Sequence, residues 1–127
     1  MQNSNNKHIQ TKFIDLTQSQ SQIWTGQQLS ANSPLYNMAF TFEFDGQINV
    51  DIFRAAFQML LQESDAMRTI FETIEEIPQQ KICEDFSYDF QHLDFSQKEN
   101  KAVVLQEFVS TRSQIIFDIS KRLFDAV

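Results

Sequence analysis

Apolar residues at helical spacing and apolar residues at strand spacing follow one another along this chain, and their order restricts the fold more than any other feature. Thr17 followed by Gln20 is the signature of a helix start and predicts a helix over residues 18–29. Residues 37–45 then alternate strictly, which predicts a strand with one buried face. The apolar side chains of that face are Met38, Phe40, Phe42 and Phe44.

The alternation continues to the end of the chain. The further predicted elements are a helix from a cap at Asn49 or Asp51 to about Glu63, strands at 69–74 and 80–84 joined by a turn, a strand at 86–94, a helix opened by a second capping box at Ser96 and Glu99, and a strand starting at Lys121. This order is typical of an α/β fold, which we predict as a mixed sheet flanked by helices. We expect the apolar face of residues 37–45 to pack on the helix that carries Phe57 and Leu61.

A length of 127 residues is sized for one domain. Residues 1–12 are predicted to be a disordered leader, because nothing in them can be buried. Residues 13–127 are predicted to form the domain itself. The apolar run that begins at Leu123 reaches Val127 without a turn signal, and we interpret it as a strand of a domain that continues.

Charge and composition exclude several classes of function. Lys and Arg number 10 against 17 Asp and Glu, a net charge of −7, so no nucleic-acid-binding surface is expected. A single cysteine, Cys83, excludes a disulfide framework and any multi-cysteine metal site. No stretch approaches the roughly 18 apolar residues of a membrane span, and the polar N-terminus lacks the apolar core of a secretory signal. These features predict a cytoplasmic protein without a membrane partner.

Taken alone, the residues show no catalytic constellation. His8 lies in the predicted leader, and His92 is in register with the apolar side of the strand before the last helix, where we expect it to be hydrogen-bonded. Cys83, in a short apolar strand, is interpreted as a small core residue. With only Gly26 and Gly46, the chain has no glycine-rich phosphate loop. We therefore predict no catalytic, cofactor-binding or metal-ligating residue.

Residues 16–24 resemble the first core motif of nonribosomal peptide synthetase condensation domains, which reads roughly S-x-A-Q-x-R-L-W. Thr17, Gln20 and Trp24 carry the match, while Gln22 stands where the motif has arginine. This segment includes the predicted capping box. The family resemblance therefore concerns the same helix start that the residues predict on their own.

A second core motif of the same family, R-H-E-x-L-R-T-x-F, resembles residues 63–71. Arg68, Thr69 and Phe71 match it, and Ser64 replaces the histidine. Two further segments resemble family landmarks at the expected distances, namely residues 93–96 and 117–120. The similarity covers nearly everything from Phe13 onward, and four landmarks in the right order identify the chain as similar to the N-terminal part of such a domain.

This resemblance implies the coenzyme A-dependent acyltransferase fold of chloramphenicol acetyltransferase, of which the chain would form part of the N-terminal lobe. It also implies a reaction, the formation of amide or ester bonds between thioesters held on the phosphopantetheine of carrier proteins, with no cofactor bound directly. The family's catalytic residue is the second histidine of H-H-x-x-x-D-G. This sequence has no such motif. The resemblance therefore implies a truncated fragment that is inactive alone.

For Arg68 the resemblance implies a place beside the catalytic loop, where its guanidinium would pair with the loop's aspartate. In this chain we expect it to contact a local carboxylate or water instead. The implied partners are carrier domains and the missing remainder of the condensation domain, and we expect self-association through exposed apolar surface. Two other hypotheses stay open: a non-catalytic interaction module derived from the same lobe, and an unrelated small α/β binding protein.

Overall fold

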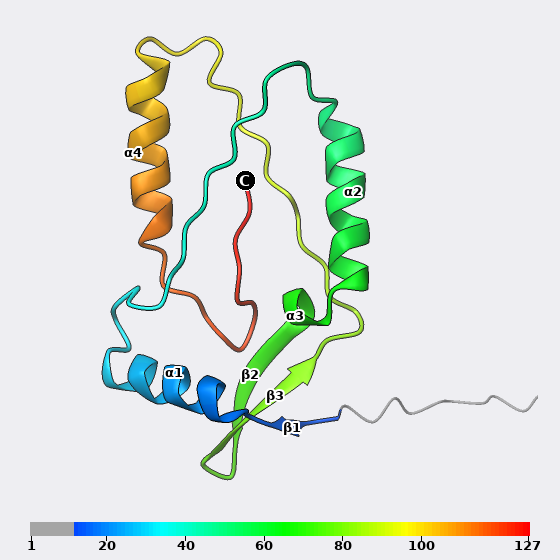
Figure 1. The fold of residues 1–127 in the computed structure, drawn as a ribbon, viewed down its shortest axis with the longest axis vertical. Coiled ribbons are helices and arrows are strands. Elements are labelled where there is room, and N and C mark those ends of the chain that lie inside the picture. Colours follow the sequence, from blue (N-terminus) through cyan, green and yellow to red (C-terminus); the bar gives the residue numbers. More distant parts are fainter. Residues whose placement is uncertain (1–11) are drawn as a thin grey trace, which may run out of the picture.

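Figure 1 shows the fold in the computed structural model, which describes residues 12–127. The elements along the chain are β1 (Ile14–Asp15), α1 (Gln18–Leu29), α2 (Val50–Glu63), α3 (Asp65–Arg68), β2 (Thr69–Ile74), β3 (Ile77–Ile82) and α4 (Lys101–Ser113). The predicted leader lies outside the described residues, apart from Lys12. No helix of the described part is long and apolar enough to cross a membrane.

The two helix starts predicted at Thr17 and at Asn49 are confirmed. At α1, the Thr17 N–H donates to Oε1 of Gln20 over 2.8 Å, and the Gln20 N–H donates to Oγ1 of Thr17 over 3.3 Å. At α2, the Ile52 N–H donates to Oδ1 of Asn49 over 3.0 Å, so Asn49 is the cap. These bonds satisfy backbone groups that the first turn of a helix leaves without a partner.

The start of α4 differs from the prediction. Ser96 does not cap a helix: it lies in a tight turn, where its N–H donates to Oδ1 of Asp94 over 2.7 Å. The helix begins at Lys101, after Asn100, which has a φ of 53°. Asparagine adopts this left-handed conformation more readily than most residues do, so the chain reverses there. The capping box predicted at Ser96 and Glu99 is therefore wrong.

A small antiparallel sheet lies at one end of the molecule, in the order β1-β3-β2 (Figure 1). The predicted hairpin is confirmed, but its second strand begins at Ile77 rather than Gln80. Its turn needs only two residues, Glu75 and Glu76, with φ of 49° and 68°. Two positive φ angles match the twist of a two-residue hairpin. The strand therefore starts earlier than the predicted four-residue turn allowed.

Three segments that were predicted as strands, residues 37–45, 86–94 and 121–127, are extended but join no ladder of the described residues. All three run toward the top of the view in Figure 1, between α4 and α2. A side chain takes the place of a ladder between two of them. The Tyr88 hydroxyl accepts from the Ala126 N–H over 2.7 Å and lies 2.8 Å from its carbonyl oxygen. The Ala126 N–H is thus satisfied without a neighbouring strand.

The predicted packing of residues 37–45 on α2 is wrong. The side chains of Phe40 and Phe42 are 74% and 76% exposed, and Met38 is exposed as well. Only Phe44 reaches the helix, with its ring centroid 6.3 Å from that of Phe53. The segment leads directly into α2, so only its last apolar side chain lies beside the helix.

The buried core lies elsewhere, between α2, β2 and the extended segments 86–94 and 121–127. Its buried apolar residues are Leu61, Ile70 and Tyr88. The Phe57 ring on α2 lies 5.1 to 6.2 Å from three aromatic rings, those of Tyr88, Phe90 and Phe124. Aromatic pairs at such distances add to the free energy of burial. Phe57 and Leu61 of α2 thus take part in the core, but their partners are not the residues 37–45 that were predicted.

Candidate functional site

The first predicted motif lies on α1 and contacts the sheet through one side chain. Thr17 caps the helix, and Trp24 is half-buried along it. The Gln20 side chain donates from Nε2 to Oε1 of Gln80 on β3 over 2.9 Å. Gln80 faces Phe71 in the register of β3 with β2. Two motif residues, Gln20 and Phe71, are thus joined through one residue between them.

Arg68 and Thr69 of the second motif lie where α3 ends and β2 begins. Arg68 Nη2 lies 2.6 Å from Oδ1 of Asp65, and its Nη1 donates to the Cys83 carbonyl over 3.1 Å. The Thr69 hydroxyl donates to the Asp65 carbonyl over 2.8 Å. The expected contact of Arg68 with a local carboxylate is therefore confirmed. Its Nε is buried and has no hydrogen-bond partner among the described residues.

The other two landmarks share one local geometry. In each, an aspartate accepts the N–H two residues later: Asp94 from Ser96 over 2.7 Å and Asp118 from Ser120 over 3.2 Å. Hydrogen bonds from Ser120 and from Lys121 lower the pKa of the Asp118 carboxyl to about 2. Each aspartate therefore stabilises the turn that follows it in the chain.

Three of the four landmarks meet at the sheet. The Phe71 N–H donates to the Ile119 carbonyl over 2.9 Å, which ties the fourth landmark to β2. The third landmark lies apart from the sheet, beside α4, where the centroids of the Phe95 and Phe108 rings are 5.7 Å apart. The fold thus assembles the predicted motif residues into a structural junction around β2 and β3.

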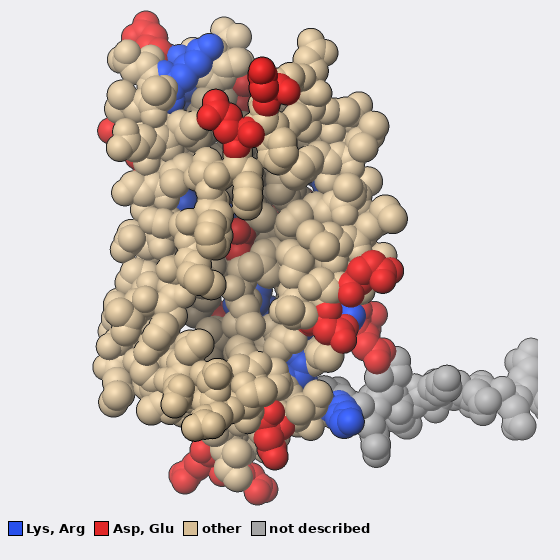
Figure 2. Space-filling view, viewed as in Figure 1, with Lys and Arg blue, Asp and Glu red and all other residues tan. Residues whose placement is uncertain are grey.

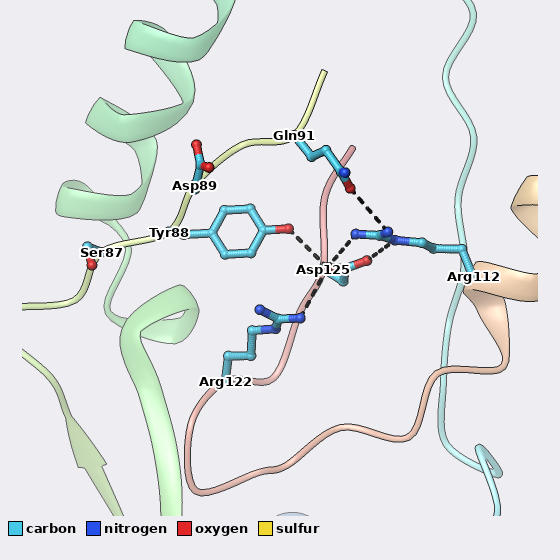
Figure 3. A pocket seen from close by; sticks show the side chains of 7 residues that line it. All are labelled: Ser87, Tyr88, Asp89, Gln91, Arg112, Arg122 and Asp125. Carbon is cyan, nitrogen blue, oxygen red and sulfur yellow. Dashed lines mark hydrogen bonds and ion pairs between the residues drawn. The ribbon is translucent and has the colours of Figure 1, made fainter. Parts of the chain in front are cut away.

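A pocket of about 290 Å³ lies between α4 and two extended segments, and the sequence did not predict it. Figure 3 shows its side chains, with a tyrosine hydroxyl and two guanidinium groups directed at one carboxylate. The lining residues are Ser87, Tyr88, Asp89, Gln91, Arg112, Arg122 and Asp125. The pocket therefore combines both signs of charge in one small space.

Asp125 is the centre of this cluster, with a side chain only 8% exposed. Arg112 holds it in a bidentate pair, Nε to Oδ2 and Nη2 to Oδ1, the latter at 3.1 Å. The Tyr88 hydroxyl lies 3.0 Å from Oδ1, and Arg122 Nη2 lies 3.4 Å from the same oxygen. Arg112 also donates to Oε1 of Gln91 over 3.3 Å. A buried carboxylate with this many donors is fully compensated.

The pKa shifts keep Asp125 and Arg112 charged and Tyr88 neutral at pH 7. Burial raises the pKa of Asp125, but the hydrogen bonds from Arg112 and Tyr88 outweigh it and hold that pKa below its usual value. Burial raises the pKa of Tyr88, and the bond to Asp125 raises the pKa of Arg112. Each of these pKa values moves away from neutrality. The cluster is therefore suited to holding segments together and unsuited to proton transfer near pH 7.

Sequence reasoning did not single out Tyr88, Arg112, Arg122 or Asp125, because they come from three segments far apart in the chain. One signal was available. Asp125 interrupts the apolar run that begins at Leu123, and an acidic side chain in such a run needs a charged partner.

The remaining sequence candidates, His92 and Cys83, lie outside the Asp125 cluster, and Cys83 contacts Arg68 through its backbone. His92 is exposed, and no side-chain hydrogen bond to it occurs within residues 12–127, so the expected hydrogen-bonded position is wrong. Cys83 is half-buried at the end of the hairpin and is a free thiol. Within the described part of the chain, no three His, Cys, Asp or Glu side chains gather as metal ligands would.

Acid is expected to weaken this network. Because the pKa of Asp125 in the folded chain lies below its ordinary value, the stability that it contributes is present above that value and is lost as the pH falls through about 4 and lower. We expect Asp125→Asn to be less stable than the wild type at pH 6, with a difference that narrows below about pH 4. Urea unfolding from pH 6 downward measures it. A difference that stays constant with pH would contradict the assignment.

The condensation domain family model matches residues 10–126. The chain therefore belongs to the condensation domain family. This confirms the resemblance that the four landmarks indicated.

Individual proteins agree with this assignment. The chain is 34% identical over 56 residues, 44% of its length, to a dimodular nonribosomal peptide synthase of Bacillus subtilis (strain 168), and covers 2% of that protein. It is 23% identical over 109 residues, 85% of its length, to the malpibaldin synthetase of Mortierella alpina, and again covers 2%.

Among solved structures, the starter condensation domain of rhizomide synthetase RzmA is similar, with a TM-score of 0.81 and 24% identity. The similarity covers 88% of this chain and 27% of that one. This confirms the predicted fold class, an α/β part of the acyltransferase-type fold. The chain thus spans about a quarter of a solved condensation domain.

Proposed function

We propose that this chain is the N-terminal part of a condensation domain that joins carrier-protein-bound acyl and aminoacyl thioesters by an amide or ester bond. The main observation in support of this proposal is the junction at β2 and β3, where the segments of three family landmarks meet through Gln20, Phe71 and Ile119. The family match over residues 10–126 supports the same conclusion. Carrier domains and the remainder of a condensation domain are the proposed partners.

Arg68 is the motif residue with unused bonding capacity. Two of its nitrogens already have partners, Asp65 and the Cys83 carbonyl, while its buried Nε has none in the described part of the chain. A buried donor without an acceptor is costly, so a further acceptor is favoured there. This supports the proposal that Arg68 receives an aspartate from the catalytic loop of a complete domain.

The chain by itself is proposed to be inactive. Its histidines, His8 and His92, are not adjacent, so the H-H-x-x-x-D-G motif is absent from these 127 residues. Loss of a positioned proton-transfer group alone costs about 10²–10⁴-fold in rate. The Asp125 cluster does not replace it, because its pKa values lie away from neutrality.

The test supplies donor and acceptor carrier proteins, each loaded with its thioester, and follows the condensed product by mass spectrometry. We expect the chain to give no more product than the carriers alone. Product above that level would contradict the proposed inactivity. Sequencing the coding region beyond Val127 tests the parent: an H-H-x-x-x-D-G motif supports the proposed domain, and a stop codon opposes it.

A non-catalytic interaction module is the alternative, and one observation favours it. The exposed side chains of Met38, Phe40 and Phe42 offer an apolar surface that needs no histidine to bind a partner. A stop codon directly after Val127 would support this alternative over the catalytic parent.

A further inference from the structure

Residues 38–46 form the most exposed extended segment of the described chain. Each of them is exposed, on both faces of the segment. Within residues 12–127, no hydrogen bond involves the backbone of residues 38–45. A row of free N–H and C=O groups beside large apolar side chains is a template for pairing with another strand.

The segment is complementary to itself in one antiparallel register. The apolar stripe of the segment consists of Met38, Phe40, Phe42 and Phe44. If a second copy pairs with Thr41 opposite Thr41, each residue of this stripe faces an apolar residue of the other copy: Phe40 faces Phe42, and Met38 faces Phe44. A shift of two residues either places Met38 opposite Gly46 or places Phe44 opposite Tyr36, which lies in the turn before the segment, so only this register pairs the four residues with one another. Aromatic cross-strand pairs of this kind stabilise a sheet.

Charge permits the same register. Glu43 would face Ala39, and Asp45 would face Asn37, so no two acidic side chains lie directly opposite each other. The segment has no lysine and no proline, the residues with which natural edge strands prevent pairing. In Figure 2 the charged side chains gather mainly near the edges of the face, and much of its middle is uncharged.

We propose that two copies of this chain pair antiparallel through residues 38–45, about a twofold axis at Thr41. The contact is isologous, since the same segment serves both copies. It requires only the chain as it exists and is independent of the proposed catalytic parent. The remainder of a condensation domain is the competing occupant of this surface.

Disulfide trapping tests the register. With Cys83→Ala as background, Thr41→Cys places two thiols on directly opposite residues, about 4.5–5.5 Å apart between Cα atoms, which suits a disulfide. Glu43→Cys is the matched control, because it lies on the same face but about 14 Å from its copy, four positions along the strand. We expect a covalent dimer, on mild oxidation, from Thr41→Cys and little from Glu43→Cys. Equal trapping at both positions, or none at Thr41→Cys, would overturn the register.

Sedimentation at increasing concentration tests the pairing without a cysteine. We expect the wild type to shift from monomer to dimer, and Thr41→Lys to stay monomeric at concentrations at least tenfold higher, since it places two like charges opposite each other. Thr41 is exposed, so circular dichroism should show an unchanged fold. The proposal would be overturned if the wild type stayed monomeric at every concentration, or if Thr41→Lys dimerised as strongly as the wild type. The remainder of a condensation domain would then be the favoured partner of the apolar stripe. Neither result bears on the condensation assay.

Discussion

Replacing Arg112 with alanine is expected to lower the free energy of unfolding by about 3 kcal/mol, the lower end of what breaking a buried ion pair costs. The change removes both bidentate contacts to Asp125, whose carboxylate stays buried. The Tyr88 hydroxyl at 3.0 Å and Arg122 at 3.4 Å remain, and they keep the loss from being larger. Urea unfolding at pH 7, followed by circular dichroism, measures the change.

The matched control is Arg54→Ala on α2. Arg54 also pairs with an aspartate, Asp51 at 3.3 Å, but this pair lies at the surface. Surface pairs of this kind are worth about 0–1 kcal/mol. If the Arg112 and Arg54 variants lose the same free energy, the Asp125 cluster does not hold the described fold together.

Replacing Leu61 with alanine is expected to cost about 2–5 kcal/mol, because it removes a fully buried side chain and leaves a cavity. Leu61 is 1% exposed, the lowest fraction among the buried core residues. In a protein of ordinary stability, about 5–15 kcal/mol, this is a large share of the total. Thermal unfolding followed by circular dichroism should show a clearly lower midpoint.

Leu60→Ala provides the comparison, since it makes the same chemical change one position earlier on α2. Leu60 is 52% exposed, so its variant should lose less than about 1 kcal/mol. Helix propensity is altered equally in both variants, and the difference between them isolates burial. Equal losses would place the core on another face of α2.

The elements that sequence patterns predicted well are those governed by neighbours in the chain. The helix that follows Thr17 and the one that follows Asn49 begin where a side chain reaches a backbone N–H three residues later. Such bonds need no distant partner, so the sequence is sufficient to predict them. Ser96 was wrongly predicted as a cap, because it lies in a turn held by Asp94 and the helix begins only after Asn100.

The predicted strands separate into two groups. The hairpin predicted at 69–74 and 80–84 is present because a short turn joins its strands and sets their register, although its second strand lies at Ile77–Ile82. Residues 37–45 have a stronger alternating pattern, yet they join no ladder among the described residues. Alternation indicates that a face can be buried, but not which segment covers it.

The sequence by itself determined where α1, α2 and the hairpin lie, and it carried the motif residues that place the chain in the condensation domain family. These features depend on residues within a few positions of one another. Only the tertiary structure decided that Asp125 is buried against Arg112 and Tyr88, and that Phe40 stays exposed. Burial and ion pairing depend on which distant segments lie side by side, and spacing along the chain does not contain that information.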